Sequence, residues 1–176
     1  MGVVLTEGRV EFTFDDGLEV ARYDEWQHHR EWLQRAPGRG KAVDFVAATT
    51  HTLTLIEVKD YREADVENPP PSDLPTVIAA KVYDTIASLR LASRSAYKAS
   101  EKAFATRTAS ANAIVVIAHV DQRRTRSRLR PALIDAVALR AALKRELKFL
   151  KDYSAYVTSV DDPVDQQPYR SSSTSA

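Results

Sequence analysis

Three charged residues that could perform chemistry together lie between positions 41 and 61: Asp44, Glu57 and Lys59. Glu57 and Lys59 are separated by one residue, so both side chains emerge on the same face of an extended strand. Two carboxylates beside an ammonium group offer hard oxygen ligands of the kind that Mg²⁺ or Mn²⁺ prefers, together with water and phosphate oxygens. These residue types at this spacing indicate a site for phosphoryl transfer.

Two strands must position these side chains, and the sequence predicts them at residues 42–48 and 52–59. A hairpin turning at Thr50-His51 pairs positions whose numbers sum to 101, which sets Asp44 opposite Glu57 with Cβ atoms about 5 Å apart. The connection lacks the Asn-Gly or Gly-X pair of a good two-residue turn, and a slip of one residue would move Asp44 to the other face. The turn itself therefore stays open.

A solvated hairpin with paired cross-strand charges is the alternative interpretation. The apolar run 53–56 before Glu57 favours a site, because it predicts a central, largely buried strand in which unpaired charges are costly. Asp44, twelve residues and then Glu57-Val58-Lys59, with both acids in apolar strands, resembles the PD-(D/E)xK nucleases of the restriction-endonuclease-like superfamily. Val43 departs from the proline of that motif.

The resemblance implies an α/β fold: a restriction-endonuclease-like mixed sheet flanked by helices, here preceded by an N-terminal hairpin. It implies hydrolysis of phosphodiester bonds with Mg²⁺ (or Mn²⁺), in DNA as the substrate class, with RNA left open. Asp44, Glu57 and the Val58 carbonyl would bind the metal, and Lys59 would orient or deprotonate the attacking water. Lys81 would reach back to the site from the next helix.

Ordinary surface roles remain open for the outlying candidates. Lys81 could equally be an amphipathic lysine with a solvated head. Glu25 and Glu31 are available as an additional acid from a preceding helix, or they are plain helix surface. The adjacent His28 and His29 point about 100° apart on a helix, so they are expected at the surface and not as a paired ligand site.

Composition bounds the class of protein. The chain has 176 residues, no cysteine and a net charge of +1, which favours one domain in a reducing, cytoplasmic environment and excludes zinc ribbons and thiol catalysis. No long apolar run predicts a membrane span. One cluster without acids could contact nucleic-acid phosphates or form a solvated loop: Arg123, Arg124, Arg126, Arg128 and Arg130.

The remaining elements follow from periodicity and turn residues. We expect one domain over residues 1–160 and a flexible C-terminal tail over 161–176. The expected elements are a hairpin of 9–14 with 18–23, a helix over 24–35, a helix from 73, a buried strand at 113–120, a helix over 132–151 and an edge strand at 153–160.

The sequence thus predicts a metal-dependent nuclease that acts on DNA. An inactive nuclease-fold protein that serves as a nucleic-acid-binding or assembly subunit is the alternative, and an unrelated α/β interaction module is a third. A homo-oligomer or a larger complex stays open, and no membrane partner is expected.

Overall fold

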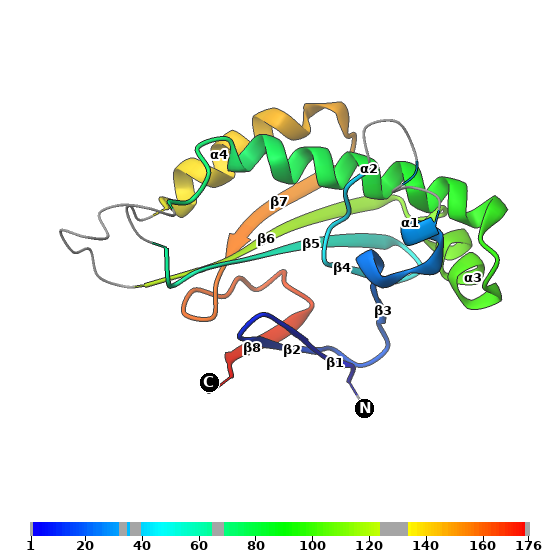
Figure 1. Cartoon of the computed structure of the whole chain (residues 1–176), viewed down its shortest axis with the longest axis horizontal. Helices are drawn as coiled ribbons and strands as arrows, with labels where there is room; N and C mark the ends of the chain where they lie inside the picture. The colour runs from blue at the N-terminus through cyan, green and yellow to red at the C-terminus, as the bar shows by residue number, and fades with distance from the viewer. Residues whose placement is uncertain (1, 32–34, 36–39, 65–68, 124–133, 175–176) are drawn as a thin grey trace.

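The computed structural model describes residues 2–31, 35, 40–64, 69–123 and 134–174. Within them, helices cover one face of a five-stranded sheet, and a three-stranded sheet lies against the other face (Figure 1). The α/β class predicted from the sequence is confirmed. In this part of the chain every helix is too short or too polar to cross a membrane.

The main sheet is mixed and has the strand order β3-β4-β5-β6-β7. The first three strands pair antiparallel, whereas β5, β6 and β7 run parallel. β7 is at the edge of the sheet, which confirms the edge strand predicted at residues 153–160. The strands are β3 (Glu19–Arg22), β4 (Phe45–Ala48), β5 (Thr52–Tyr61), β6 (Ala113–Gln122) and β7 (Tyr153–Thr158).

The helical layer consists of α2 (Leu74–Ser95), α3 (Ala99–Thr108) and α4 (Ala136–Glu146), which the short 3-10 helix η3 (Leu147–Phe149) follows. On α2, the apolar residues Ile78, Val82 and Leu89 recur at helical spacing and are buried. They pack with the helix-facing side of the main sheet in one apolar core. The predicted helix over 132–151 is shorter in the structure, because α4 begins after its N-cap Asp135.

The β4–β5 hairpin has the predicted register. Phe45 faces Ile56 and Ala48 faces Leu53, so the numbers of each pair sum to 101. The Thr49 hydroxyl accepts hydrogen bonds from the backbone N–H groups of His51 at 3.2 Å and Thr52 at 3.0 Å. This threonine closes the turn in place of the missing Asn-Gly pair.

The N-terminal hairpin exists, but the predicted partner strand is wrong. β2 (Val10–Phe14) pairs with β1 (Val4–Glu7) across Gly8, whose φ of 56° is the left-handed conformation that glycine adopts easily. Its other edge pairs with β8 (Tyr169–Ser173). Both edges of β2 are therefore occupied, and β3 joins β4 in the main sheet.

The predicted flexible tail from residue 161 is also corrected, because β8 belongs to the fold. Phe12, Phe14 and Tyr169 are buried between the two sheets. The low apolar content of residues 161–176 gave no sign of this strand in the sequence. Tyr169 is the single aromatic residue of β8, and backbone pairing with β2 holds its other residues in the sheet.

The predicted helix over 24–35 is replaced by two short turns, η1 (Tyr23–Glu25) and α1 (Gln27–Glu31); residues 32–34 lie outside the described part. His28 and His29 are each only 4% exposed, so their predicted surface position is wrong. The cause is the buried Glu101 of α3, whose carboxylate accepts the N–H groups of Gln27 and His28 and holds α1 against the helical layer.

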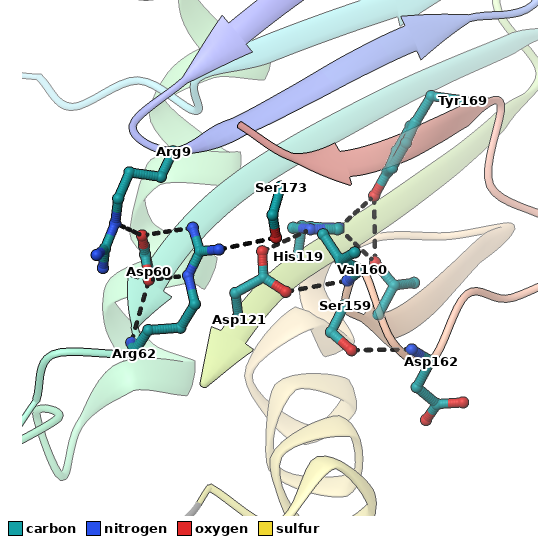
Figure 2. A network of polar contacts seen from close by, with 11 residues as sticks. Arg9, Asp60, Arg62, His119, Asp121, Ser159, Val160, Asp162, Tyr169 and Ser173 are labelled. Atoms are coloured by element: carbon teal, nitrogen blue, oxygen red, sulfur yellow. Dashed lines mark hydrogen bonds and ion pairs between the residues drawn. The ribbon is translucent and has the colours of Figure 1, made fainter. Parts of the chain in front are cut away.

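A polar network joins the two sheets (Figure 2). Arg62 donates Nε to Oδ1 of Asp60 at 2.9 Å and Nη2 to Oδ2 at 2.8 Å, while Arg9 of the small sheet donates Nε to the same carboxylate at 3.0 Å. The hydrogen bonds from Arg62 hold the pKa of Asp60 well below its usual range. Arg62 also donates to the Ser173 hydroxyl of β8.

Replacing Asp60 by asparagine is expected to cost about 1 kcal/mol of unfolding free energy at neutral pH, a value kept small because the pair is partly solvated. The pKa of Asp60 is lower in the folded than in the unfolded chain. The stabilisation by the Asp60 carboxylate is therefore complete at pH values above 3.8, its pKa in the unfolded chain, and is lost as the pH falls below that value. Urea unfolding of both proteins from pH 3 to 7 measures it; a constant difference across that range would contradict the assignment.

Candidate functional site

The predicted charged residues converge between the main sheet and α2. Asp44 directly precedes β4, Glu57 and Lys59 lie on the helix-facing side of β5, and Lys81 reaches down from α2. The hairpin register brings Asp44 to the position opposite Glu57. The structure therefore places all four of these side chains in one site.

Glu57 is at the centre of the site and its side chain is 0% exposed. Its Oε1 lies 2.5 Å from the Lys59 Nζ and 2.6 Å from the Lys81 Nζ. Its Oε2 is buried and has no hydrogen-bond partner within the described part of the chain. One carboxylate oxygen is therefore compensated by two ammonium groups and the other is left with unused hydrogen-bonding capacity.

The ionisation of Glu57 is disfavoured in the folded protein. Burial is the main cause that raises the pKa of this carboxyl, and the neighbouring Asp44 charge raises it further, while the two lysines act in the opposite direction. Burial is the largest single influence on the pKa of Lys59 and lowers it, but the charge and hydrogen bond of Glu57 and the charge of Asp44 together raise it overall. The Lys59 ammonium group is thus held charged beside a carboxylate whose ionisation burial disfavours.

Asp44 is held by the backbone of β5. Its Oδ2 accepts the N–H of Val58 at 2.7 Å, and its Oδ1 lies 3.9 Å from the Lys81 Nζ. Val58 thus contacts Asp44 through its amide, whereas the sequence prediction assigned its carbonyl to a metal. This contact fixes the direction of the Asp44 carboxylate toward Glu57.

The donor set partly suits a divalent cation. The orphaned Oε2 of Glu57 and the weakly engaged Oδ1 of Asp44 are hard oxygen ligands, and Mg²⁺ is often held by one or two carboxylates completed by water and phosphate. Two ammonium groups already balance the two acids, however. Within the described residues, no group of three or more His, Cys, Asp or Glu side chains gathers as a metal site.

Neither of the predicted additional acids reaches the site through a described contact. The Glu25 carboxylate lies 3.8 Å from Arg22, and Glu31 accepts a hydrogen bond from Gln27. The charge of Asp44 instead acts on two other acids, Glu7 and Asp24. Burial is the main cause that raises the pKa values of their carboxyl groups, and the Asp44 charge is the second cause.

Sequence reasoning missed Glu7 and Asp24 because it took neither the strand β1 nor the turn η1 into account. The position of Asp24 just after β3, next to the motif strand β4, was the only available indication.

The arginine cluster is described only at its first member. Arg123 donates Nη1 to the Ala64 carbonyl at 2.5 Å, and its buried Nε has no partner in the described part of the chain. This side chain is engaged with the turn after β5. Arg124, Arg126 and Arg128 lie outside the described residues, so their predicted contact with nucleic acid remains a prediction.

Comparisons with known proteins give one informative relative. The chain is 29% identical over 178 aligned positions to the cysteine–tRNA ligase of Neisseria meningitidis serogroup A, serotype 4A, strain DSM 15465 / Z2491. The match covers 85% of this chain, which spans about a quarter of the length of the ligase (26%). No profile of a known protein family and no solved structure matches the chain.

This match contradicts the function predicted from the sequence. The relative is a tRNA ligase and not a nuclease, so the predicted metal-dependent nuclease, with its endonuclease class and DNA substrate, is corrected. Carboxylates and a lysine at this spacing are compatible with more than one chemistry on phosphates, and the motif alone did not distinguish between them.

Proposed function

We propose that this chain is a tRNA-binding domain that works together with a tRNA ligase. The observation that carries the proposal is the match to a cysteine–tRNA ligase over 85% of the chain. The ligase has about three quarters of its length outside the match, so the aligned region accounts for one part of a larger assembly. Because the relative is a tRNA ligase, we propose RNA and not DNA as the partner of this chain.

The site between β4, β5 and α2 would hold one phosphate of the RNA. Lys59 and Lys81 have side chains 26% and 18% exposed, so their ammonium groups lie at the boundary of the solvent. Asp44 and Glu57 would hold a Mg²⁺ ion through the carboxylate oxygens that make no short contact. The ion, when bound, supplies positive charge that neutralises the phosphate.

We also propose that the main sheet has a restriction-endonuclease-like fold without the activity of that superfamily. The antiparallel order β3-β4-β5, followed by a helical crossover to the parallel strand β6, supports this relationship. Of the predicted motif, Asp44 directly precedes β4, and Glu57 and Lys59 lie on β5. Such a fold would present the acids and lysines as a binding site for a phosphate backbone.

Binding of a fluorescently labelled tRNA transcript tests the function. We expect the wild-type chain to bind the tRNA, with an affinity about tenfold higher in millimolar Mg²⁺ than in a chelator. Asp44→Asn is expected to abolish this difference. Asp73→Asn makes the same change at an exposed residue away from the site and should leave the difference intact.

Absence of measurable tRNA binding by the wild-type chain would reject the proposed function. If every variant binds tRNA with the same affinity in Mg²⁺ and in the chelator, tRNA remains the proposed partner and the proposed ion is rejected. Thermal melting of each variant in parallel separates a binding defect from unfolding.

A further inference from the structure

The outer face of the helical layer carries two exposed aromatic side chains. Tyr83 of α2 is 58% exposed and Phe149 of η3 is 48% exposed. Their ring centroids lie 5.6 Å apart with an interplanar angle of 79°, an edge-to-face contact. Each ring has a large part of its surface in water. Because the rings meet edge-to-face, each of them offers its own exposed apolar face.

Basic side chains and one exposed acid, Glu146, precede Phe149 in the chain. Lys144 and Arg145 end α4, and Lys148 lies in η3 one residue before Phe149. All three are exposed, and within the described residues none of them pairs with an acid. By contrast, the basic residues Arg9, Arg62, Lys59 and Lys81 are each paired with a carboxylate.

The basic surface extends onto α2. Arg90 follows Tyr83 by about two helical turns and therefore lies on the same side of the helix. Tyr83 of α2 contacts Phe149 of η3, so α2 and the segment that follows α4 contribute to one surface.

We propose that this surface binds RNA: a base stacks on an exposed ring face of Tyr83 or Phe149, while Arg90, Lys144, Arg145 and Lys148 contact phosphates. Stacking on exposed aromatic rings combined with unpaired cations is the way in which proteins hold unpaired nucleotides. A protein partner fits less well, because lysine is depleted in protein–protein interfaces. The inference rests on the proposed tRNA-binding function and names the surface that carries it.

Fluorescence anisotropy with a labelled tRNA transcript and with a mixed-sequence single-stranded RNA tests the surface. The variant Lys144→Gln/Arg145→Gln/Lys148→Gln is expected to bind both RNAs at least about tenfold more weakly and to lower the slope of log affinity against log salt by roughly two for the single strand. Tyr83→Leu/Phe149→Leu is expected to lose about fivefold to a hundredfold in affinity, with an unchanged slope.

The matched control is Lys41→Gln/Lys102→Gln/Arg170→Gln. It removes the same charge from exposed side chains that make no ion pair within the described residues and lie on other elements. We expect it to weaken binding by less than about threefold. Melting temperatures of all variants should remain close to that of the wild type, since the substituted side chains are exposed.

The outcomes separate the two proposals. If the wild type binds RNA and the triple variant on α4 and η3 weakens no more than the control, this surface is excluded and the proposed function stands. If the wild type binds neither RNA, both fail. A third outcome is that poly-L-glutamate, added at the same total charge as the RNA, displaces the RNA, while Tyr83→Leu/Phe149→Leu binds RNA as tightly as the wild type. In that case the surface binds an acidic protein and the RNA assignment is overturned.

Discussion

Replacing Tyr169 by alanine is expected to lower the free energy of unfolding by about 3–5 kcal/mol, the usual cost of truncating a buried aromatic side chain. Tyr169 is 2% exposed, and its ring centroid lies 5.1 Å from that of Phe12 and 5.6 Å from that of Phe14. Its hydroxyl lies 3.1 Å from Oγ1 of Thr158. The substitution therefore opens a cavity between the sheets and removes a buried hydrogen bond.

Urea unfolding followed by circular dichroism measures this effect. Tyr169→Phe is the conservative control: it keeps the ring and loses the hydroxyl contacts with Thr158 and His119, so we expect a loss of about 1–2 kcal/mol. Stability of Tyr169→Ala within about 1 kcal/mol of the wild type would mean that β8 is not part of the cooperative fold.

The second large effect is expected from Lys59→Met/Lys81→Met. Both ammonium groups that compensate Glu57 are then absent, and a fully buried carboxylate remains beside Asp44. Breaking a buried ion pair from one side typically costs about 3–5 kcal/mol. We expect a loss of that size at pH 7.5, and adding Glu57→Gln should recover most of it.

The pH dependence identifies the cause. The pKa of Glu57 is above its unfolded value of 4.5 already in the wild type, and loss of the lysines raises it further. The carboxylate therefore destabilises the fold when the pH is above its folded pKa, and the cost disappears as the pH falls toward 4.5. Equal unfolding free energies for the double variant and the wild type at pH 7.5 would show that Glu57 is hydrated.

Local patterns in the sequence were sufficient to predict the centre of the site. The short connection between the two apolar strands predicted the pairing of Asp44 with Glu57, and the turn closed by Thr49 gives this register. Helical periodicity placed Lys81 on α2. The parts predicted correctly are those whose determinants lie within about thirty residues of one another.

The parts that failed depend on distant partners. β8 carries little apolar surface, and pairing with β2 decides its conformation. His28 and His29 are buried because Glu101, far along the chain, accepts the N–H groups that begin α1. The biochemical class failed for another reason: the charged residues of a phosphate site do not specify the reaction. The finding that contradicts the predicted class is the similarity to a cysteine–tRNA ligase, which no local motif in the sequence indicated.

The pairing of β2 with β8 has a consequence for the order of folding. The hairpins β1–β2 and β4–β5 close over a few residues, whereas β8 joins Val10 to Ser173. Because the entropy of closing a loop grows with its length and non-local strand pairs form slowly, we expect β8 to dock last during refolding. Until then Phe12 and Phe14 lack the cover of Tyr169, which makes this intermediate the species most prone to self-association and the one that a chaperone would recognise.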